Sequence, residues 1–400
     1  MTATAPAAPA KVYFTNLRTH ARESQLDKLK RLIRHAGIEQ IDFENKFVAI
    51  KIHFGELGNL SFLRPNYARA VADVVKELGG KPFLTDCNTL YVGSRKNALE
   101  HIDTAYQNGF TPYATGCQII IADGLKGTDE ALVPVEGGEY VREAKIGRAL
   151  MDADIVISLT HFKGHEQAGF GGAMKNLAWA AAAAPARWSS MPPASRTSRP
   201  STVLAAVPAK RSVRTALSRL TTPVSASSPT ATPVRFTLPL STMIAAWAAA
   251  AASACATRTP SSPAMTLRPT CSTARSPSIR SRCRRPSELP YFACHGHQPN
   301  CDCHPENDTP IVNDIGMFAS FDPVAIDQAC ADAVMASEPL PNTELTDSAA
   351  KMEHNHEHLE GDQAKDPFCI THPDTDWRTC IAHAEKIGLG TSKYELIEVK

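Results

Sequence analysis

The sequence predicts an α/β protein with a mixed or parallel sheet, flanked by helices and interrupted by an insert. Three observations predict this fold class. Apolar, β-branched strands alternate with segments of helical periodicity. Polar clusters follow several strands, at the end where parallel sheets bind their ligands. A stretch of foreign composition, residues 178–287, separates the two regular parts of the 400-residue chain.

The first regular part, residues 11–177, carries most of the predicted elements. Lys11–Leu17 is a short apolar strand, and Ser24–His35 has its apolar residues at helical spacing. Lys46–Phe54 is nearly continuous and β-branched, which is typical of a buried parallel strand. Asn66–Leu78 is helical and stops at two glycines. The remaining elements are a helix at Glu143–Met151 and strands at Lys81–Asp86, Gln118–Asp123 and Asp154–Phe162.

The second regular part, residues 291–400, continues the alternation. Pro323–Met335 and Trp377–Ile387 are expected to be helices, and Tyr394–Val399 a closing strand. We therefore predict one α/β domain in two pieces, 11–177 and 291–400, on either side of an aberrant segment at 178–290.

The middle segment is abnormal in composition. Residues 178–287 contain fourteen Arg and one Lys but no Asp, Glu, Gly, Asn, Gln or His, whereas the remainder of the chain is acidic. Three interpretations are open: a basic arm that binds nucleic acid, a low-complexity linker, or a segment translated out of frame. We favour the third, because GC-rich coding DNA read off-register yields mainly Ala, Arg, Pro, Ser and Thr.

Codon arithmetic is consistent with a lost base just after Leu177. Restoring the frame forces Gly at positions 180 and 248 and Asp at position 244, since Trp and Met have single codons. Ala and Val can then become Cys at two runs spaced C-x2-C-x2-C-x3-C, the ligand pattern of bacterial ferredoxins. These positions of lost cluster ligands are Val203, Ala206, Ala209, Val213, Ala246, Ala249, Ala252 and Ala256.

Six stretches outside the middle segment carry a family resemblance. They are Val48–Glu56, Leu84–Tyr91, Ile157–His165, Gly169–Asn176, Asn300–His304 and Gly316–Pro323. In these stretches the chain resembles the iron–sulfur-centre proteins of the domain-of-unknown-function 362 family. The resemblance implies an α/β domain with a ferredoxin-like insert that holds two four-iron four-sulfur clusters. Because this chain has the aberrant segment in that place, we expect it to bind neither cluster.

Polar side chains follow three predicted strands, and the carboxyl ends of parallel strands share one rim. The predicted ligand-binding residues on this rim are Lys51, His53, Glu56, Asp86, Asn88, His161, Lys163 and His165. Their histidines could act in acid–base chemistry or bind a metal, and Lys51 and Lys163 could hold an anion. His53, His161 and Lys163 are the catalytic candidates. The alternative is that these residues only close strand ends with hydrogen bonds.

Two further motifs flank the insert. Gly169-x-Gly-Gly-x-x-Lys175 could bring the backbone close to an anion, with Lys175 as a ligand-binding residue, or could be only a tight turn. Cys301-x-Cys303-His304 offers three metal ligands within four residues, although a structural role is equally open. Cys87 follows a strand and is a candidate reactive thiol. The histidine tract at residues 354–358 is better interpreted as a solvated loop.

The resemblance implies electron transfer or an oxidoreductase reaction in relatives whose clusters are intact. The alternative is a non-redox metal- or anion-binding enzyme that uses the rim residues. The partner is then a redox protein or a small-molecule ligand, neither of which the sequence names. A formal net charge of +1 argues against specific nucleic-acid binding, and no apolar run reaches the length of a membrane helix. With no secretory signal visible, we expect a cytoplasmic protein.

Overall fold

The computed structural model describes residues 9–134, 143–178, 181, 291–294, 297–355, 359 and 361–400. Apart from Ala178 and Ala181, the segment interpreted as out of frame lies outside the described residues, as do all eight positions of lost cluster ligands and His356 and His358. The strands are β1 (Ala10–Asn16), β2 (Phe47–Lys51), β3 (Lys81–Thr85), β4 (Gln118–Ile119), β5 (Glu130–Pro134), β6 (Glu143–Gly147), β7 (Ile155–His161), β8 (Lys163–His165), β9 (Gly169–Gly171), β10 (Tyr291–Cys294), β11 (Gly316–Ser320) and β12 (Tyr394–Glu398). The α-helices are α1 (Gln25–His35), α2 (Pro65–Glu77), α3 (Ala98–Gln107), α4 (Pro112–Thr115), α5 (Arg148–Asp152), α6 (Ala173–Ala178), α9 (Pro323–Met335), α10 (Glu344–Asn355), α11 (Pro367–Thr371) and α12 (Trp377–Lys386), with 3-10 turns η1 (Ile38–Gln40) and η3 (Gly361–Lys365).

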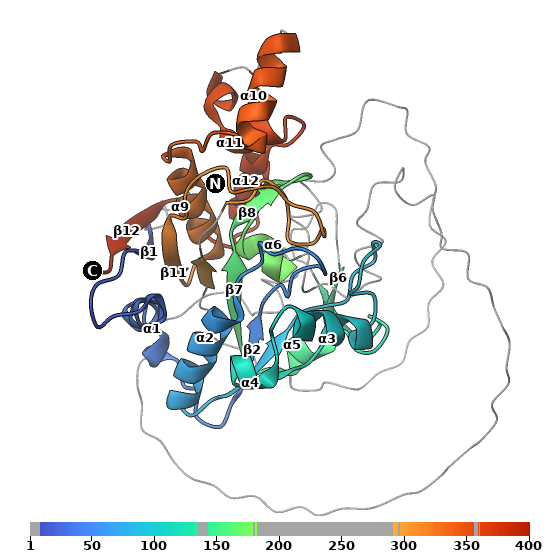
Figure 1. The fold of residues 1–400 in the computed structure, drawn as a ribbon. Coiled ribbons are helices and arrows are strands. Elements are labelled where there is room, and N and C mark those ends of the chain that lie inside the picture. Colours follow the sequence, from blue (N-terminus) through green and yellow to red (C-terminus); the bar gives the residue numbers. More distant parts are fainter. Residues whose placement is uncertain are drawn as a thin grey trace, which may run out of the picture.

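Strands from both ends of the sequence form one mixed sheet, as Figure 1 shows. Its order is β12-β1-β11-β10-β7-β2-β3-β4. Strands β10, β7, β2, β3 and β4 run parallel, whereas β11 is antiparallel to both β10 and β1. The predicted α/β class with a sheet flanked by helices is confirmed.

Alternate side chains of the central strands enter two separate cores. Val48 and Ile50 of β2 pack with the helices α1 and α2, whereas Ala49 faces the other core, which contains residues of α5, α6, α9 and α12. Both faces of the sheet are therefore covered, which explains the nearly continuous apolar sequence of β2 and β7. Such burial of both faces leaves the strand ends as the place for polar groups.

One predicted helix is wrong in its first half. Glu143–Gly147 is strand β6, paired antiparallel with β5, and only Arg148–Asp152 is helical. Ala144 and Ile146 are buried while Glu143 is exposed, so the segment alternates with the period of a strand. Lys145 Nζ bonds Glu130 Oε1 across the hairpin at 2.8 Å.

A short hairpin, β8–β9, carries the segment that holds the two neighbouring cysteines. The N–H of Gly164 donates to the carbonyl of Gln298 at 2.8 Å. A Cβ at Gly164 would overlap the carbonyl oxygen of Pro299, so only glycine lets the two backbones pass this closely. Gly164 thereby fixes where residues 297–304 cross the end of the sheet.

Across the described ranges, none of the helices combines the length and apolar character needed to cross a membrane.

Candidate metal centre

Parallel strands β2 and β3 end in a buried ion pair. Lys51 Nζ lies 2.9 Å from Asp86 Oδ1 and donates to Asn176 Oδ1 at 2.8 Å. The Asn176 amide in turn donates to the carbonyl of Lys51 at 3.1 Å. The lysine predicted to hold an anion therefore faces a carboxylate of the protein itself.

Arg95 joins His53 and Glu56 into a second buried group. Its Nε donates to Glu56 Oε2 at 3.0 Å, and a terminal nitrogen lies 3.0 Å from His53 Nε2. Burial and the Arg95 charge hold the pKa of His53 well below its ordinary value, so the ring is neutral near pH 7. Burial raises the pKa of Glu56, but Arg95 and the Ser94 hydrogen bonds outweigh it and the net pKa is lowered. Nothing in the sequence pattern singled out Arg95, which lies in the loop before α3.

His161 and Lys163 meet Asp302, the residue between the two cysteines. His161 Nδ1 lies 2.9 Å from Asp302 Oδ2, and Lys163 Nζ lies 3.5 Å from the same oxygen. Burial raises the pKa of Asp302, but the contacts with His161 and Lys163 outweigh it and the pKa falls well below its ordinary range. Asp302 is therefore a buried carboxylate that anchors the cysteine segment to the end of β7.

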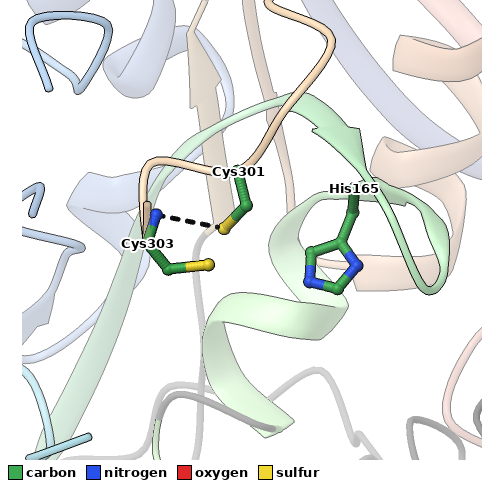
Figure 2. Close-up of side chains that lie close together, drawn as sticks. All are labelled: His165, Cys301 and Cys303. Atoms are coloured by element: carbon green, nitrogen blue, oxygen red, sulfur yellow. Dashed lines mark hydrogen bonds between the residues drawn. The ribbon is translucent and has the colours of Figure 1, made fainter. Parts of the chain in front are cut away.

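Cys301, Cys303 and His165 converge above α6 (Figure 2). One ligand atom from each lies within 4.8 Å of the others, and all three residues are buried. Cys301 comes from the loop after β10, and His165 from the end of β8. The His165 Nδ1 atom accepts a hydrogen bond from the Gln167 N–H at 3.1 Å. Burial and Lys175 lower the pKa of His165 to about 3, which keeps the imidazole neutral as metal ligation requires.

Lys175 lies beside the two thiols and favours their charged form. Its Nζ donates to Cys301 Sγ at 2.9 Å, and the Cys303 N–H donates to the same sulfur at 3.3 Å. Burial opposes the Lys175 charge, yet the sulfurs of Cys301 and Cys303 raise its pKa. A hydrogen bond with Cys301 lowers the pKa of Cys303 to about 7 against the effect of burial, with help from Lys175. Burial raises the pKa of Cys301 well above its ordinary value. Together these pKa shifts indicate that Cys301 and Cys303 share one proton, with the Lys175 ammonium beside them.

A second set of donors shares Cys303. Glu166, Cys303 and His304 also place one ligand atom each within 4.8 Å of one another. His304 Nε2 lies 3.0 Å from Glu166 Oε1, and this bond raises the pKa of His304. The predicted metal residues Cys301, Cys303 and His304 are therefore close in space, joined by His165 and Glu166.

The other predicted residues lie elsewhere. Asn88 is buried and donates to Asp123 Oδ1 at 2.9 Å. Cys87 is fully buried with its sulfur 3.4 Å from the Ala181 carbonyl. Two further cysteines that the sequence did not nominate for the site, Cys117 and Cys330, are also buried, and burial raises the pKa of Cys117 to about 11.

An α/β sheet with a buried Cys/His donor set beyond its parallel strand ends defines a protein with a candidate metal centre. The chain belongs to the DUF362 family, because the family profile described as "Domain of unknown function (DUF362)" matches residues 48–332. A thylakoid-associated protein of Synechocystis sp. is 31% identical over 126 residues, 30% of this chain and 33% of that protein. The chain thus matches about a third of the length of this relative.

Two solved structures align with part of the chain. The lactate racemase apoprotein of Thermoanaerobacterium thermosaccharolyticum aligns with a TM-score of 0.30 at 14% identity, over 43% of this chain and 39% of the racemase. A protein of Thermotoga maritima aligns with a TM-score of 0.29 at 14% identity, over 41% of this chain and 39% of that protein. Neither likeness extends to half of either chain.

Proposed function

We propose that this protein binds a divalent metal ion through Cys301, Cys303 and His165, and that zinc suits these donors best. The observation that carries the proposal is the convergence of two buried sulfurs and one buried imidazole within 4.8 Å. Thiolate and imidazole are the ligands that zinc prefers. Three protein donors leave one coordination position open, which is typical of catalytic rather than structural zinc sites.

The observed geometry needs only small changes to hold an ion. Bonds of roughly 2.0–2.3 Å imply tetrahedral donor separations of about 3.3–3.8 Å, so donors within 4.8 Å of one another need to close by no more than about 1.5 Å. Binding through His165 Nε2 requires the ring proton on Nδ1, which opens the Gln167 hydrogen bond. One such bond is worth about 1 kcal/mol, against the ~10–16 kcal/mol typical of structural zinc in small peptides.

The surrounding residues support a metal-dependent reaction at the rim. When bound, such an ion supplies Lewis-acid chemistry at its open position. Lys175 donates to Cys301 and so keeps negative charge on the sulfur pair. Asp302 and His161 fix the backbone between the two cysteines. The partner we propose is a small-molecule ligand bound beyond the strand ends, where parallel sheets hold their ligands.

An iron–sulfur role is the second candidate, and one placement favours it. Lys175 contacts Cys301 although the middle segment lies between them in the sequence. The two thiols therefore lie close to the C-terminal end of the first domain piece, where the middle segment begins. In family members with the eight thiolates, electrons would pass between two four-iron four-sulfur clusters and this rim, with a redox protein as partner. For this chain we propose a frameshifted insert and no cluster. The nucleotide sequence of codons 177–300 tests the frame, and near-stoichiometric iron and acid-labile sulfide would refute the absence of a cluster.

We place this function in the cytoplasm. Cys117, Cys301, Cys303 and Cys369 are free thiols, as expected where glutathione keeps thiols reduced.

Zinc titration of the full-length chain, in competition with a chromophoric chelator, tests the metal proposal. The wild-type protein should take up at least one equivalent tightly, and Cys301→Ser and His165→Gln should lose it. Cys380→Ser is the matched control, since Cys380 lies on α12 and belongs to neither donor set. Absence of zinc uptake by the wild type, or equal uptake by Cys301→Ser and the control, would refute the proposal.

A further inference from the structure

We infer that the centre holds two metal ions, with the Cys303 thiolate as a bridge between them. The first ion is that of the proposed function, on which this inference rests. The second would be bound by Cys303 Sγ, a Glu166 carboxylate oxygen and a ring nitrogen of His304. The ligand class is again a borderline divalent cation such as Zn²⁺, because the donors are a thiolate, a carboxylate and an imidazole.

The second donor set meets the same distance limit as the first. Each set has its three ligand atoms within 4.8 Å of one another, and Cys303 belongs to both. A thiolate sulfur has enough lone pairs to bind two ions. Ions that share a ligand in two-metal sites lie about 3.5–4 Å apart, a separation that one sulfur can span.

Glu166 is already arranged as a ligand. Its Oε1 atom lies 3.0 Å from His304 Nε2, so a single proton occupies the place between two metal-binding atoms. Its Oε2 atom is buried and has no hydrogen-bond partner among the described residues. An unsatisfied buried carboxylate oxygen is costly, and a cation beside it removes the cost.

The second position is open to solvent, unlike the first. The side chains of His304 and Glu166 are 39% and 36% exposed, whereas Cys301 and Cys303 are buried. A metal site needs an entry path, and the proton between His304 and Glu166 can leave to water as the ion arrives. The second position therefore also provides the route to the first.

Three contacts support His304, two of them to its ring. Its Nδ1 atom lies 3.8 Å from Glu306 Oε1, and a carboxylate near the second nitrogen commonly orients metal-binding histidines. Tyr91 stacks on the ring with centroids 6.5 Å apart and planes 16° from parallel. The Asn59 amide donates to the His304 carbonyl at 2.8 Å. Such support around a half-exposed histidine is what a metal ligand requires.

Charges near the bridge permit a second cation. Arg95 pairs with Glu56 at 3.0 Å, and Lys163 with Asp302 at 3.5 Å. Lys175 donates to Cys301, the sulfur that only the first ion uses. Glu166 and the Cys303 thiolate then bring two negative charges to the second ion.

Metal stoichiometry of the full-length chain tests the inference. Wild-type protein should bind two equivalents of Zn²⁺, and His304→Ala and Glu166→Gln should each bind one with unchanged affinity. His35→Ala and Glu39→Gln, which lie far along the chain on α1 and η1, are the matched controls and should bind two. With Co²⁺, the second equivalent should add about half of the sulfur-to-metal absorption of the first, because it gains one thiolate bond against two.

The outcomes separate this inference from the proposed function. Saturation at one equivalent in the wild type, with His304→Ala unchanged, refutes the second ion while the first site stands. Two equivalents in both His304→Ala and Glu166→Gln also refute it, because the second ion then lies elsewhere. No uptake at all refutes both proposals.

Discussion

Lys175 donates a hydrogen bond from Nζ to the sulfur of Cys301 at 2.9 Å, across the point where the middle segment separates the two pieces of the chain. Lys175 lies on α6, just after the glycine-rich turn, and Cys301 lies in the loop that Gly164 positions. A Cβ at Gly171 would come within 3.0 Å of the Lys175 side chain, so the glycine leaves room for it. The lysine predicted to bind an external anion thus stabilises negative charge on the protein's own thiols.

Lys175→Met should slow alkylation of Cys303 at pH 7. Removing the cation raises the pKa of Cys303 above its value of about 7, and a rise of one pH unit lowers the thiolate fraction up to about tenfold. Iodoacetamide labelling of the metal-free protein, followed by mass spectrometry of the peptide, measures the rate. The difference should shrink by pH 9.5, and Lys175→Arg should stay near wild type. Equal alkylation rates for Lys175→Met and wild type at pH 7 would show that the Lys175 charge does not lower the pKa of Cys303.

Lys51→Met should strongly destabilise the fold. The substitution leaves Asp86 buried without its closest cation, and breaking a buried pair typically costs about 3–5 kcal/mol. Urea unfolding measures the loss. The control is Lys46→Met, which removes an exposed pair with Asp42 and should have no measurable effect.

The double variant Lys51→Met/Asp86→Leu distinguishes the loss of the ion-pair attraction from the cost of burying the Asp86 carboxylate without Lys51. It should be milder than Lys51→Met alone, because the core then holds no carboxylate that has lost its closest cation. A double variant that unfolds more easily than the single one would contradict this account.

The sequence predicts the parts of the centre that depend on strand order. Lys51 and Asp86 follow neighbouring strands, so their meeting follows from a parallel sheet alone. His165 and Cys301 could each be nominated by residue type. Their pairing could not, because it depends on residues 297–304 crossing β8 at Gly164, a contact between segments far apart in the chain.

The residues that were missed lack a local signal. Arg95 lies in a loop without periodicity, and its role arises only because Glu56 and His53 fold onto it. Asp302 lies between two cysteines, and the metal-ligand spacing of the motif predicts a role for the cysteines but none for Asp302. The helix predicted at Glu143–Met151 is wrong over β6 because only five residues alternate there and a helix follows directly.

Asp327 should make the fold less stable as pH rises. Burial raises its pKa from 3.8 to about 7, although it accepts hydrogen bonds from the N–H groups of Ala173 and Met174 at 2.6 and 2.9 Å. Between these values the folded protein binds more protons than the unfolded chain, so the stabilisation is complete below pH 3.8 and is lost through pH 7. The full difference corresponds to about 4 kcal/mol.

Asp327→Asn provides the comparison, because other acids titrate as well. The difference in urea midpoint between wild type and Asp327→Asn should change between pH 5 and pH 8, because the wild type loses more stability as the pH rises. A gap that stays constant over this range would mean that Asp327 is ionised throughout, held by its two N–H donors.

Gly164→Ala should abolish metal binding while the sheet remains folded. The new methyl group would overlap the Pro299 carbonyl oxygen, so residues 297–304 must move away from β8 and carry Cys301 and Cys303 away from His165. Circular dichroism should stay close to wild type, because the main sheet does not include β8. Zinc affinity should fall by at least tenfold, since a displacement of about 1 Å already breaks tetrahedral geometry. Gly388→Ala is the control: its Cβ would meet nothing within 4 Å, and it carries only the strain of its positive φ of 75°. If Gly164→Ala binds zinc as tightly as this control, the close crossing of the two backbones does not position the thiols, and the centre must be held by Asp302 and its partners alone.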